Sequence, residues 1–519
     1  MSRKLIGLVC LIILSLCLCQ EQDQRLNKQW AKMHEQYTKQ MQQKESLPVQ
    51  QTLEEQRQTQ QLTEYKNKIF EQIMQKSGVQ QGTTQNPKFS SFLMVNRPIQ
   101  DMDMPSKFFT DEAFTTNIHS IPMMANVTRT PWSGSYWPMR NGAVSVRYGK
   151  NEKNTIGIVD PESGVFTYLF NWAQSVSRYA QPDEHNTWSK SPEFAKYVDD
   201  NYSPSEKYDL LVGDYNYTLT NFLKNEGAQY QWGGDVIGWF GLCHGWAPAS
   251  SYYPRPQRSV FLTAANGMQI RFLPDDIKGL ASLFWANADY KTKFVGNRCE
   301  FYYPSPGWFS SPNCISLNAA AFITILGNQA GLRGKNLVFD PSADPEIWNE
   351  PLKGYEFRFY NPLNNEFFPN AASAKISMSQ LRSSGDEFLN FVATNAAPAA
   401  TSAVGVFMRV TYAGLVDITD LHHNDTTAED SSTTDDYDAI LELDASDNLV
   451  GGEWKFKSHP NFLWWYDESE PVKSVSDEDI PFFGGDGSSL SGFMDQITKA
   501  SAKGQPLAAI VNLLTASAS

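Results

Sequence analysis

A cysteine at position 243 is the residue of this sequence best suited to covalent chemistry. The surrounding residues 238–249 read GWFGLCHGWAPA. Glycines permit a tight turn, and Pro248 is tolerated only near the first turn of a helix, so the pattern predicts a helix that begins close to Cys243. Unpaired N–H groups at a helix start favour a thiolate and can receive an oxyanion, which thiol acyl transfer requires. A buried structural cysteine beside core tryptophans is the alternative.

The remaining cysteines determine whether that thiol is free. The sequence has 6 cysteines, and those before residue 20 lie in an apolar leader. Cys299 and Cys314 are separated by a loop rich in Pro, Tyr and Ser that can bring them together. Closing a loop of about 15 residues stabilises a fold by roughly 3 kcal/mol. We therefore expect a Cys299–Cys314 disulfide and a free thiol at Cys243.

The N-terminus has the pattern of a secretory signal peptide. Arg3 and Lys4 precede an apolar run from Leu5 to Cys19, and polar residues follow directly. The run is shorter than the about 20 residues that a bilayer-spanning helix needs. We expect residues 1–19 to be removed and the mature protein to be secreted, extracellular and without a stable membrane span; an uncleaved signal anchor is the alternative. The N-glycosylation tripeptides that agree with export begin at Asn126, Asn201, Asn216 and Asn424.

Composition and charge narrow the class of protein. The 519 residues are 41% hydrophobic and 13% aromatic, which is enough for a large globular core. Lys and Arg number 43 against 57 Asp and Glu, for a formal net charge of −14. Binding to nucleic acid requires clustered basic side chains, so we expect no nucleic-acid partner.

The chain divides into three regions that differ in amino-acid composition. Residues 20–87 are rich in Gln and carry apolar side chains at helical spacing, and they predict a helical or partly disordered pro-segment, with a regulatory or partner-binding role as the alternative. Residues 88–470 mix strand and helix signals and predict one α+β domain. Residues 471–519 are small and weakly apolar and predict a tail. The apolar positions of the first region are Leu26, Trp30, Met33, Tyr37 and Met41.

Some elements of the α+β region can be placed. Residues 143–148 and 406–412 read as strands, and residues 275–290 and 318–332 read as helices. The segment 417–447 is rich in Asp and Glu without Lys or Arg, and we expect mainly a solvated loop. A calcium site is the alternative there. The residues from Asp444 onward do not fit an EF-hand, because the loop Gly is missing and Lys455 stands where the bidentate Glu belongs.

Ordered sequence blocks resemble one known family. Residues 241–249, GLCHGWAPA, are similar to the nucleophile segment of the transglutaminase elicitor family, which are secreted protein-glutamine γ-glutamyltransferases with a papain-like core. The resemblance covers about residues 88–466. The other similar blocks are 132–138 with 147–148, 203–209, 276–278 with 294–299, 347–355, and 441–444 with 451–454 and 459–464.

The resemblance implies an activity and its partners. A thiolate at Cys243 would attack the carboxamide of a protein-bound Gln, ammonia would leave, and a Lys amine or water would resolve the thioester. The implied partners are proteins bearing Gln and Lys. Asp340 stands where the family's orienting residue is expected, and Ile323, in the segment NAAAFI at 318–323, stands where a histidine base is expected. Isoleucine accepts no proton, and general base catalysis contributes about 10²–10⁴-fold.

That substitution leaves two further classes of function open. One is a catalytically degenerate member, a possible pseudoenzyme, that acts as an extracellular binding or structural protein through residues 348–355, which resemble the family's host-recognised surface peptide. The other is a thiol protease or amidase with water as the acceptor. Weak alternative bases are His244 and His459, and no cofactor is firmly implied, although calcium is possible. Trp232, Trp239 and Trp246 are candidates either for a substrate tunnel or for core packing.

Overall fold

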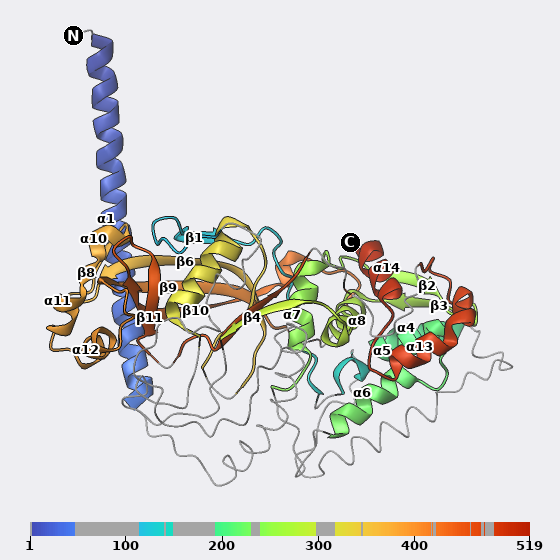
Figure 1. The fold of residues 1–519 in the computed structure, drawn as a ribbon. Coiled ribbons are helices and arrows are strands. Elements are labelled where there is room, and N and C mark those ends of the chain that lie inside the picture. The colour runs from blue at the N-terminus through green and yellow to red at the C-terminus, as the bar shows by residue number, and fades with distance from the viewer. Residues whose placement is uncertain are drawn as a thin grey trace.

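The computed structural model describes most of the chain. The described residues are 3–46, 114–139, 142–148, 192–229, 239–296, 317–343, 346–416, 418, 422–456, 458–468, 472 and 482–519. Side chains of the first helix are described from residue 22 to residue 43. Sheet and helices are both extensive, which confirms the mixed α and β composition predicted from the sequence (Figure 1).

A 10-stranded antiparallel sheet organises one part of the molecule (Figure 1). Its main order is β11-β10-β9-β6-β5-β12-β4, while β1 and β7 pair with β6 and β8 pairs with β9. The strands are β1 (Met124–Asn126), β4 (Thr292–Gly296), β5 (Val338–Asp340), β6 (Glu350–Asn361), β7 (Glu366–Phe368), β8 (Ile376–Ser377), β9 (Ser402–Gly414), β10 (Ser431–Leu443), β11 (Leu449–Trp454) and β12 (Phe462–Tyr466).

Helices form most of the other part, around a two-stranded hairpin (Figure 1). This part contains β2 (Val260–Thr263), β3 (Gln269–Phe272), η4 (Ala143–Ser145), α4 (Pro192–Asn201), α5 (Pro204–Val212), α6 (Thr218–Gln229), α7 (Cys243–Tyr252), α8 (Pro274–Asn287), η9 (Gly487–Phe493), α13 (Met494–Ser501) and α14 (Ala508–Ala518). The helices beside the sheet are α1 (Arg3–Ser46), α9 (Ala319–Leu326), η7 (Gly327–Leu332), α10 (Ala371–Ala374), α11 (Met378–Arg382), α12 (Glu387–Thr394) and η8 (Thr427–Glu429).

Side chains of the sheet alternate between separate hydrophobic cores. In β9, Val406 and Met408 pack in one core with α9, whereas Phe407 packs in another with Trp30 of α1. This is the two-residue period of a strand buried on both faces. We call these the α9 core and the α1 core. A helical core, which includes Trp246 of α7, fills the other part of the molecule.

Most of the predicted elements that can be checked are confirmed. The helix predicted at 275–290 corresponds to α8, which spans Pro274–Asn287; residues 318–332 contain α9 and η7, and residues 406–412 lie in β9. The strand predicted at 143–148 is wrong, because residues 143–145 form the 3-10 helix η4. Gly142 enters this turn in the left-handed region with φ 91°, which starts a turn rather than a strand.

Residues 26–41 of the N-terminal helix α1 pack against the sheet, whereas the N-terminal end of this helix extends away from the rest of the molecule (Figure 1). Trp30, His34 and Met41 are buried, and the remaining residues of the predicted apolar stripe pack beside them. His34 Nε2 lies 2.7 Å from Asp438 Oδ2 of β10 in a buried hydrogen bond. Residues 47–87 of the predicted pro-segment lie outside the described residues. No helix in the described part of the chain has both the length and the hydrophobicity for a membrane span.

The acidic segment and the C-terminal region are more ordered than expected. Residues 431–443 of the acidic segment form β10, between β9 and β11, so the expected solvated loop is wrong for this half. The apolar residues at the C-terminal end of this strand, such as Ile440 and Leu441, are buried and stabilise it by packing. In place of the expected tail, α13 and α14 insert Ile497, Ile510 and Leu514 into the helical core.

Candidate functional site

The predicted helix start at Cys243 is confirmed. Cys243 is the first residue of α7, and the preceding Leu242 has no side-chain oxygen to cap the helix. The carbonyl of Leu242 accepts hydrogen bonds from the N–H groups of Gly245 and Trp246, each at 2.9 Å. The first N–H groups of α7 therefore receive no side-chain cap and remain suited to an anion.

The glycines on either side of Cys243 have different roles. A Cβ at Gly241 would collide with the carbonyl oxygen of Tyr136, whose neighbouring segment lies against the helix start. The Leu242 N–H donates to that same oxygen at 2.6 Å. A Cβ at Gly245 would collide with the carbonyl oxygen of Ser282 in α8. Gly241 thus permits the close approach of the Tyr136 backbone to the start of α7, whereas Gly245 permits close packing of two helices.

An asparagine side chain faces the thiol. Asn349 Nδ2 donates to Cys243 Sγ at 3.5 Å, and only 1% of Asn349 is exposed. The indole N–H of Trp464 in β12 donates to Asn349 Oδ1 at 2.9 Å. Because an indole nitrogen can only donate, this contact fixes the amide with its NH₂ group toward the sulfur. Of the hydrogen bonds that described side chains make to the Cys243 sulfur, none comes from an imidazole.

Burial controls the protonation of this thiol. The pKa of Cys243 is raised to about 11, chiefly because burial disfavours the thiolate. Hydrogen bonds from the Asn349 side chain and from backbone N–H groups lower the pKa but do not cancel the effect of burial, and the negative charge of Glu350 raises it further. At neutral pH the folded protein therefore holds Cys243 as a neutral thiol.

Glu350 is a buried carboxyl group close enough to influence the thiol electrostatically. It is directly opposite Phe339 in the β5–β6 pair, and Phe339 is also opposite Leu463 of β12. Residues opposite one another in an antiparallel pair share a face, so Glu350 belongs to the α9-core face. Its Oε2 atom accepts no hydrogen bond from the described residues, and burial raises the pKa of Glu350 to about 8.

Asp340 lies on the other face of the same strands. It is opposite Phe462 in the β5–β12 pair, and Phe462 and Trp464 both pack in the helical core with α7. Asp340 is fully buried, and its Oδ2 accepts a hydrogen bond from Asn461 Nδ2 at 3.2 Å. Asp340 thus lies on the same strand face as Trp464, whose indole holds the Asn349 amide. The structure gives no direct contact between Asp340 and Cys243.

Ile323 and Cys243 are on opposite sides of the sheet. Ile323 is fully buried in α9 and packs in the α9 core, together with Phe339 and Leu463. Trp464, which holds the Asn349 amide, packs in the helical core. The structure therefore does not bring position 323 beside the thiol.

Neither of the two histidines considered as alternative bases, His244 and His459, hydrogen-bonds to the Cys243 sulfur through its ring in the described part of the chain. His459 is buried and stacks on Trp454 with ring centroids 5.5 Å apart. Its Nδ1 lies 3.1 Å from the carbonyl oxygen of Pro460. His244 follows Cys243 in α7, and a hydrogen bond from its backbone N–H lowers the pKa of the thiol.

The tryptophans proposed for a substrate tunnel differ in their burial. Trp246 is fully buried in the helical core, and a Cβ at Gly134 would press on its indole, so its role there is packing. Trp239 is partly buried and packs against Phe240 with ring centroids 5.9 Å apart. Trp232 and the predicted Cys299–Cys314 disulfide lie outside the described residues, and Cys243 is a free cysteine.

The segment 347–355 is not the exposed surface peptide that the sequence suggested. Ile347, Asn349, Leu352 and Tyr355 are each less than 5% exposed. The segment enters strand β6 in the middle of the sheet, which buries its backbone as well. Sequence reasoning therefore missed Asn349 and Trp464 as site residues. The signal available was their position in two blocks of the family resemblance.

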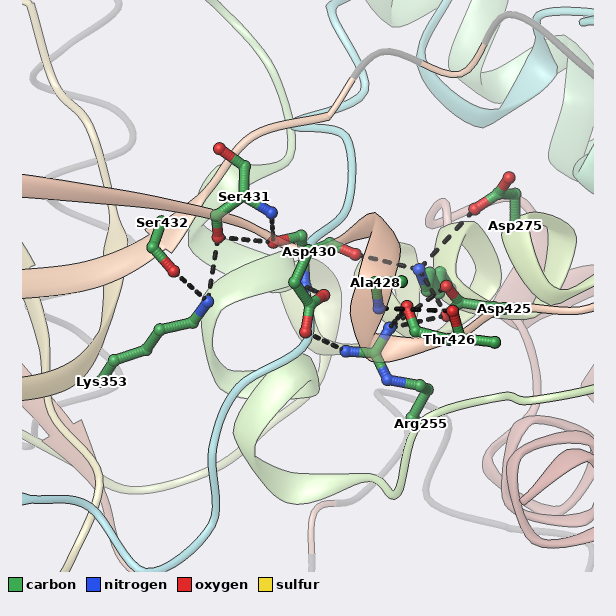
Figure 2. Close-up of polar contacts among 11 residues, drawn as sticks. Arg255, Asp275, Lys353, Asp425, Thr426, Ala428, Asp430, Ser431 and Ser432 are labelled. Carbon is green, nitrogen blue, oxygen red and sulfur yellow. Dashed lines mark hydrogen bonds and ion pairs between the residues drawn. The ribbon is translucent and has the colours of Figure 1, made fainter.

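A second polar cluster, the Arg255 network, lies beyond the C-terminal end of α7 (Figure 2). It consists of Arg255, Lys278, Asp275, Asp425 and Asp430. Arg255 pairs with Asp425 at 3.0 Å and also with Asp430, and Lys278 pairs with Asp425 at 2.8 Å. Arg255 and Lys278 thus pair with the carboxylates of this network. Within the described residues, no group of three or more His, Cys, Asp or Glu side chains could hold a metal ion.

A family model and a solved structure both indicate similarity to transglutaminases. Residues 223–480 match the family model described as transglutaminase elicitor. The fold is similar to the crystal structure of the GP42 transglutaminase from Phytophthora sojae, with a TM-score of 0.51, 18% sequence identity, and coverage of 82% of this chain and 98% of that chain. None of the curated proteins compared matches this chain.

Proposed function

Because the chain belongs to the transglutaminase elicitor family, we propose that it is an acyltransferase that joins protein-bound Gln to Lys through a thioester at Cys243. The observation that carries the proposal is the position of Cys243. The thiol is the first side chain of α7, beside N–H groups that no side chain caps, and the Asn349 amide faces it. We also propose a papain-like core, which is consistent with a nucleophile on a helix packed against a sheet.

The proposed reaction balances without an added reagent. Cys243 Sγ bonds to the carboxamide carbon of Gln, and the amide nitrogen leaves as ammonia with the proton of the thiol. The Lys amine then attacks the thioester carbonyl, the C–S bond breaks, and the amine proton returns to the sulfur. Asp340 is our proposed orienting carboxylate, because it is buried on the strand face that also carries Trp464.

The raised thiol pKa gives the proposed activity a distinct pH dependence. Since the pKa of Cys243 is about 11, the thiolate fraction should increase tenfold per pH unit between pH 7 and 10. A thiol paired with an imidazolium would instead reach a plateau near neutral pH.

The test is incorporation of a fluorescent primary amine into a Gln-bearing protein by the purified chain, measured from pH 7 to pH 10. We expect incorporation that rises with pH and is absent in Cys243→Ala. Equal signal in the two proteins at every pH would overturn the proposal. The same reaction with EDTA tests whether the activity depends on calcium, which the sequence leaves possible; the described residues offer no ligand cluster for a metal ion.

A degenerate member of the family is the second candidate. The observation that favours it is the buried, protonated thiol without an imidazole hydrogen bond among the described residues. It predicts no incorporation at any pH, together with a folded protein whose Cys243 still reacts with an alkylating agent. In either case we propose that the chain is secreted, as its N-terminal leader pattern indicates.

A further inference from the structure

We infer that Asn349 is a catalytic residue of the proposed reaction, because its side-chain amide is placed to stabilise the oxyanion that forms when Cys243 is acylated. The inference rests on the proposed acyl transfer at Cys243. It assigns to Asn349 the donation of a hydrogen bond to the acyl oxygen, and to Trp464 the positioning of that amide.

The orientation of the amide is the first argument. Trp464 donates to Asn349 Oδ1 at 2.9 Å, so the NH₂ group points toward Cys243 Sγ at 3.5 Å. A thiol sulfur is a weak acceptor, and a buried NH₂ group has two hydrogens to satisfy. The resting site therefore underuses the donor, whereas a negatively charged oxygen would be a stronger acceptor.

The location of the developing charge is the second argument. In the tetrahedral intermediate the oxyanion is on the carbon bonded to Sγ, and effective donors lie about 2.7–3.1 Å from that oxygen. A group within hydrogen-bonding distance of Sγ can reach this position with a small shift. The N–H groups at the start of α7, which no side chain caps, offer further donors next to the thiol.

The surroundings of the amide are the third argument. Asn349 is 1% exposed and Cys243 is 4% exposed, so water does not compete for the interaction. Hydrogen bonds to a developing charge are stronger in such a site than in water. The alternative is that Asn349 only ties α7 to β12 and holds the fold together.

Two reactions of the same thiol separate these possibilities. Acylation by p-nitrophenyl acetate passes through an oxyanion, whereas alkylation by iodoacetamide displaces iodide and forms none at a carbonyl. Both depend on the thiolate, so the ratio of the two rate constants cancels changes in thiol pKa. We would measure both at pH 9 for wild type, Asn349→Ala, Asn349→Asp and Trp464→Phe, after subtracting the rates of Cys243→Ala.

The inference predicts unequal losses. Removing one oxyanion donor costs about 10²–10³-fold, so Asn349→Ala should lower the acylation-to-alkylation ratio by about 10²-fold. Asn349→Asp, which keeps the shape but loses the donor, should lower it at least as much. Trp464→Phe should lower it by about tenfold, since it only frees the amide to turn. Asn364→Ala, at an exposed turn, is the control and should leave the ratio unchanged.

A ratio within twofold of wild type in both Asn349 variants, with thermal unfolding curves that show folded protein, would overturn the inference. Should Asn349→Ala fail to fold, Asn349→Asp and Trp464→Phe decide the question by the same ratio. Failure of the proposed function has a different signature: wild-type Cys243 would be acylated by the ester, yet no amine would be incorporated into a Gln-bearing protein.

Discussion

The Cys243 site and the Arg255 network both lie along helix α7, but they treat buried polar groups in opposite ways. In the network, Arg255 and Lys278 neutralise the carboxylates of Asp425 and Asp430 (Figure 2). At the site, the thiol meets a neutral amide, and no cation hydrogen-bonds to it from the described residues. The difference indicates that the network stabilises the fold, whereas the site is left able to accept new charge.

Removal of a cation from the network should have the largest effect on stability. Lys278 is buried, pairs with Asp425 at 2.8 Å and donates to the carbonyl oxygen of Ser133 at 2.9 Å. Lys278→Met leaves buried carboxylate charge uncompensated, and we expect a loss of about 3–5 kcal/mol in the free energy of unfolding, measured in urea. Lys196→Met, which breaks an exposed pair with Asp200, is the control and should cost less than about 0.5 kcal/mol. Equal losses in the two variants would show that the network is not structural.

Glu350→Gln should have the next largest effect, and it should depend on pH. The folded pKa of Glu350, about 8, is above its ordinary value of 4.5, so the folded state prefers the protonated form. Its contribution to stability is full below about pH 4.5 and is lost as pH rises through 8. Glutamine does not ionise, so the variant should gain on the order of 3 kcal/mol over wild type at pH 8.5 and little at pH 4.5. Thermal melts across this range provide the measurement, and a difference that does not vary with pH would contradict the assignment.

The same substitution also tests the electrostatic link to the site. The charge of Glu350 raises the pKa of Cys243, so Glu350→Gln should lower the thiol pKa and increase the rate of alkylation at pH 9. Glu442→Gln is a matched control, because burial raises the pKa of Glu442 to about 8 as well, while Glu442 is absent from the causes that shift the thiol. If both variants changed the alkylation rate equally, a general charge effect would replace the local one.

Ile323→His should have a smaller effect on stability and no benefit for activity. Residue 323 is fully buried in the α9 core, on the far side of the sheet from Trp464. An imidazole in this apolar core would be buried without a hydrogen-bond partner, which should lower the free energy of unfolding by about 1–3 kcal/mol. Ile323→Val is the control for volume and should cost about 0.5–1.5 kcal/mol. Restored amine incorporation in Ile323→His would show that residue 323 reaches the thiol, contrary to this structure.

The local features of the site could be predicted from the sequence because they depend on neighbouring residues. Gly241 and Pro248 limit where a helix can begin, and α7 begins at Cys243 as expected. The start of α7 needed no knowledge of distant segments. The expected free thiol rested on the proposed pairing of Cys299 with Cys314, and Cys243 is free.

The partners of the thiol could not be predicted because they depend on strand register. Asn349 meets Cys243, and Trp464 meets Asn349, only when β5, β6 and β12 pair side by side, and a shift of one residue would turn each side chain to the other face. The same reason explains the acidic segment. Its charge pattern suggested a loop, yet Arg255, from a distant part of the chain, provides a cation that allows Asp430 to be half-buried, and Lys455 provides one for the buried Asp438.

The most direct test of the account is detection of the acyl-enzyme. The purified chain would be incubated at pH 9 with a Gln-containing peptide that lacks Lys, quenched in acid, and analysed by intact mass and peptide mapping. We predict an adduct equal to the peptide mass minus ammonia, located at Cys243 and absent in Cys243→Ala. A wild-type protein that forms no such adduct, while iodoacetamide alkylates the same Cys243, would contradict the central claim that this thiol carries acyl transfer.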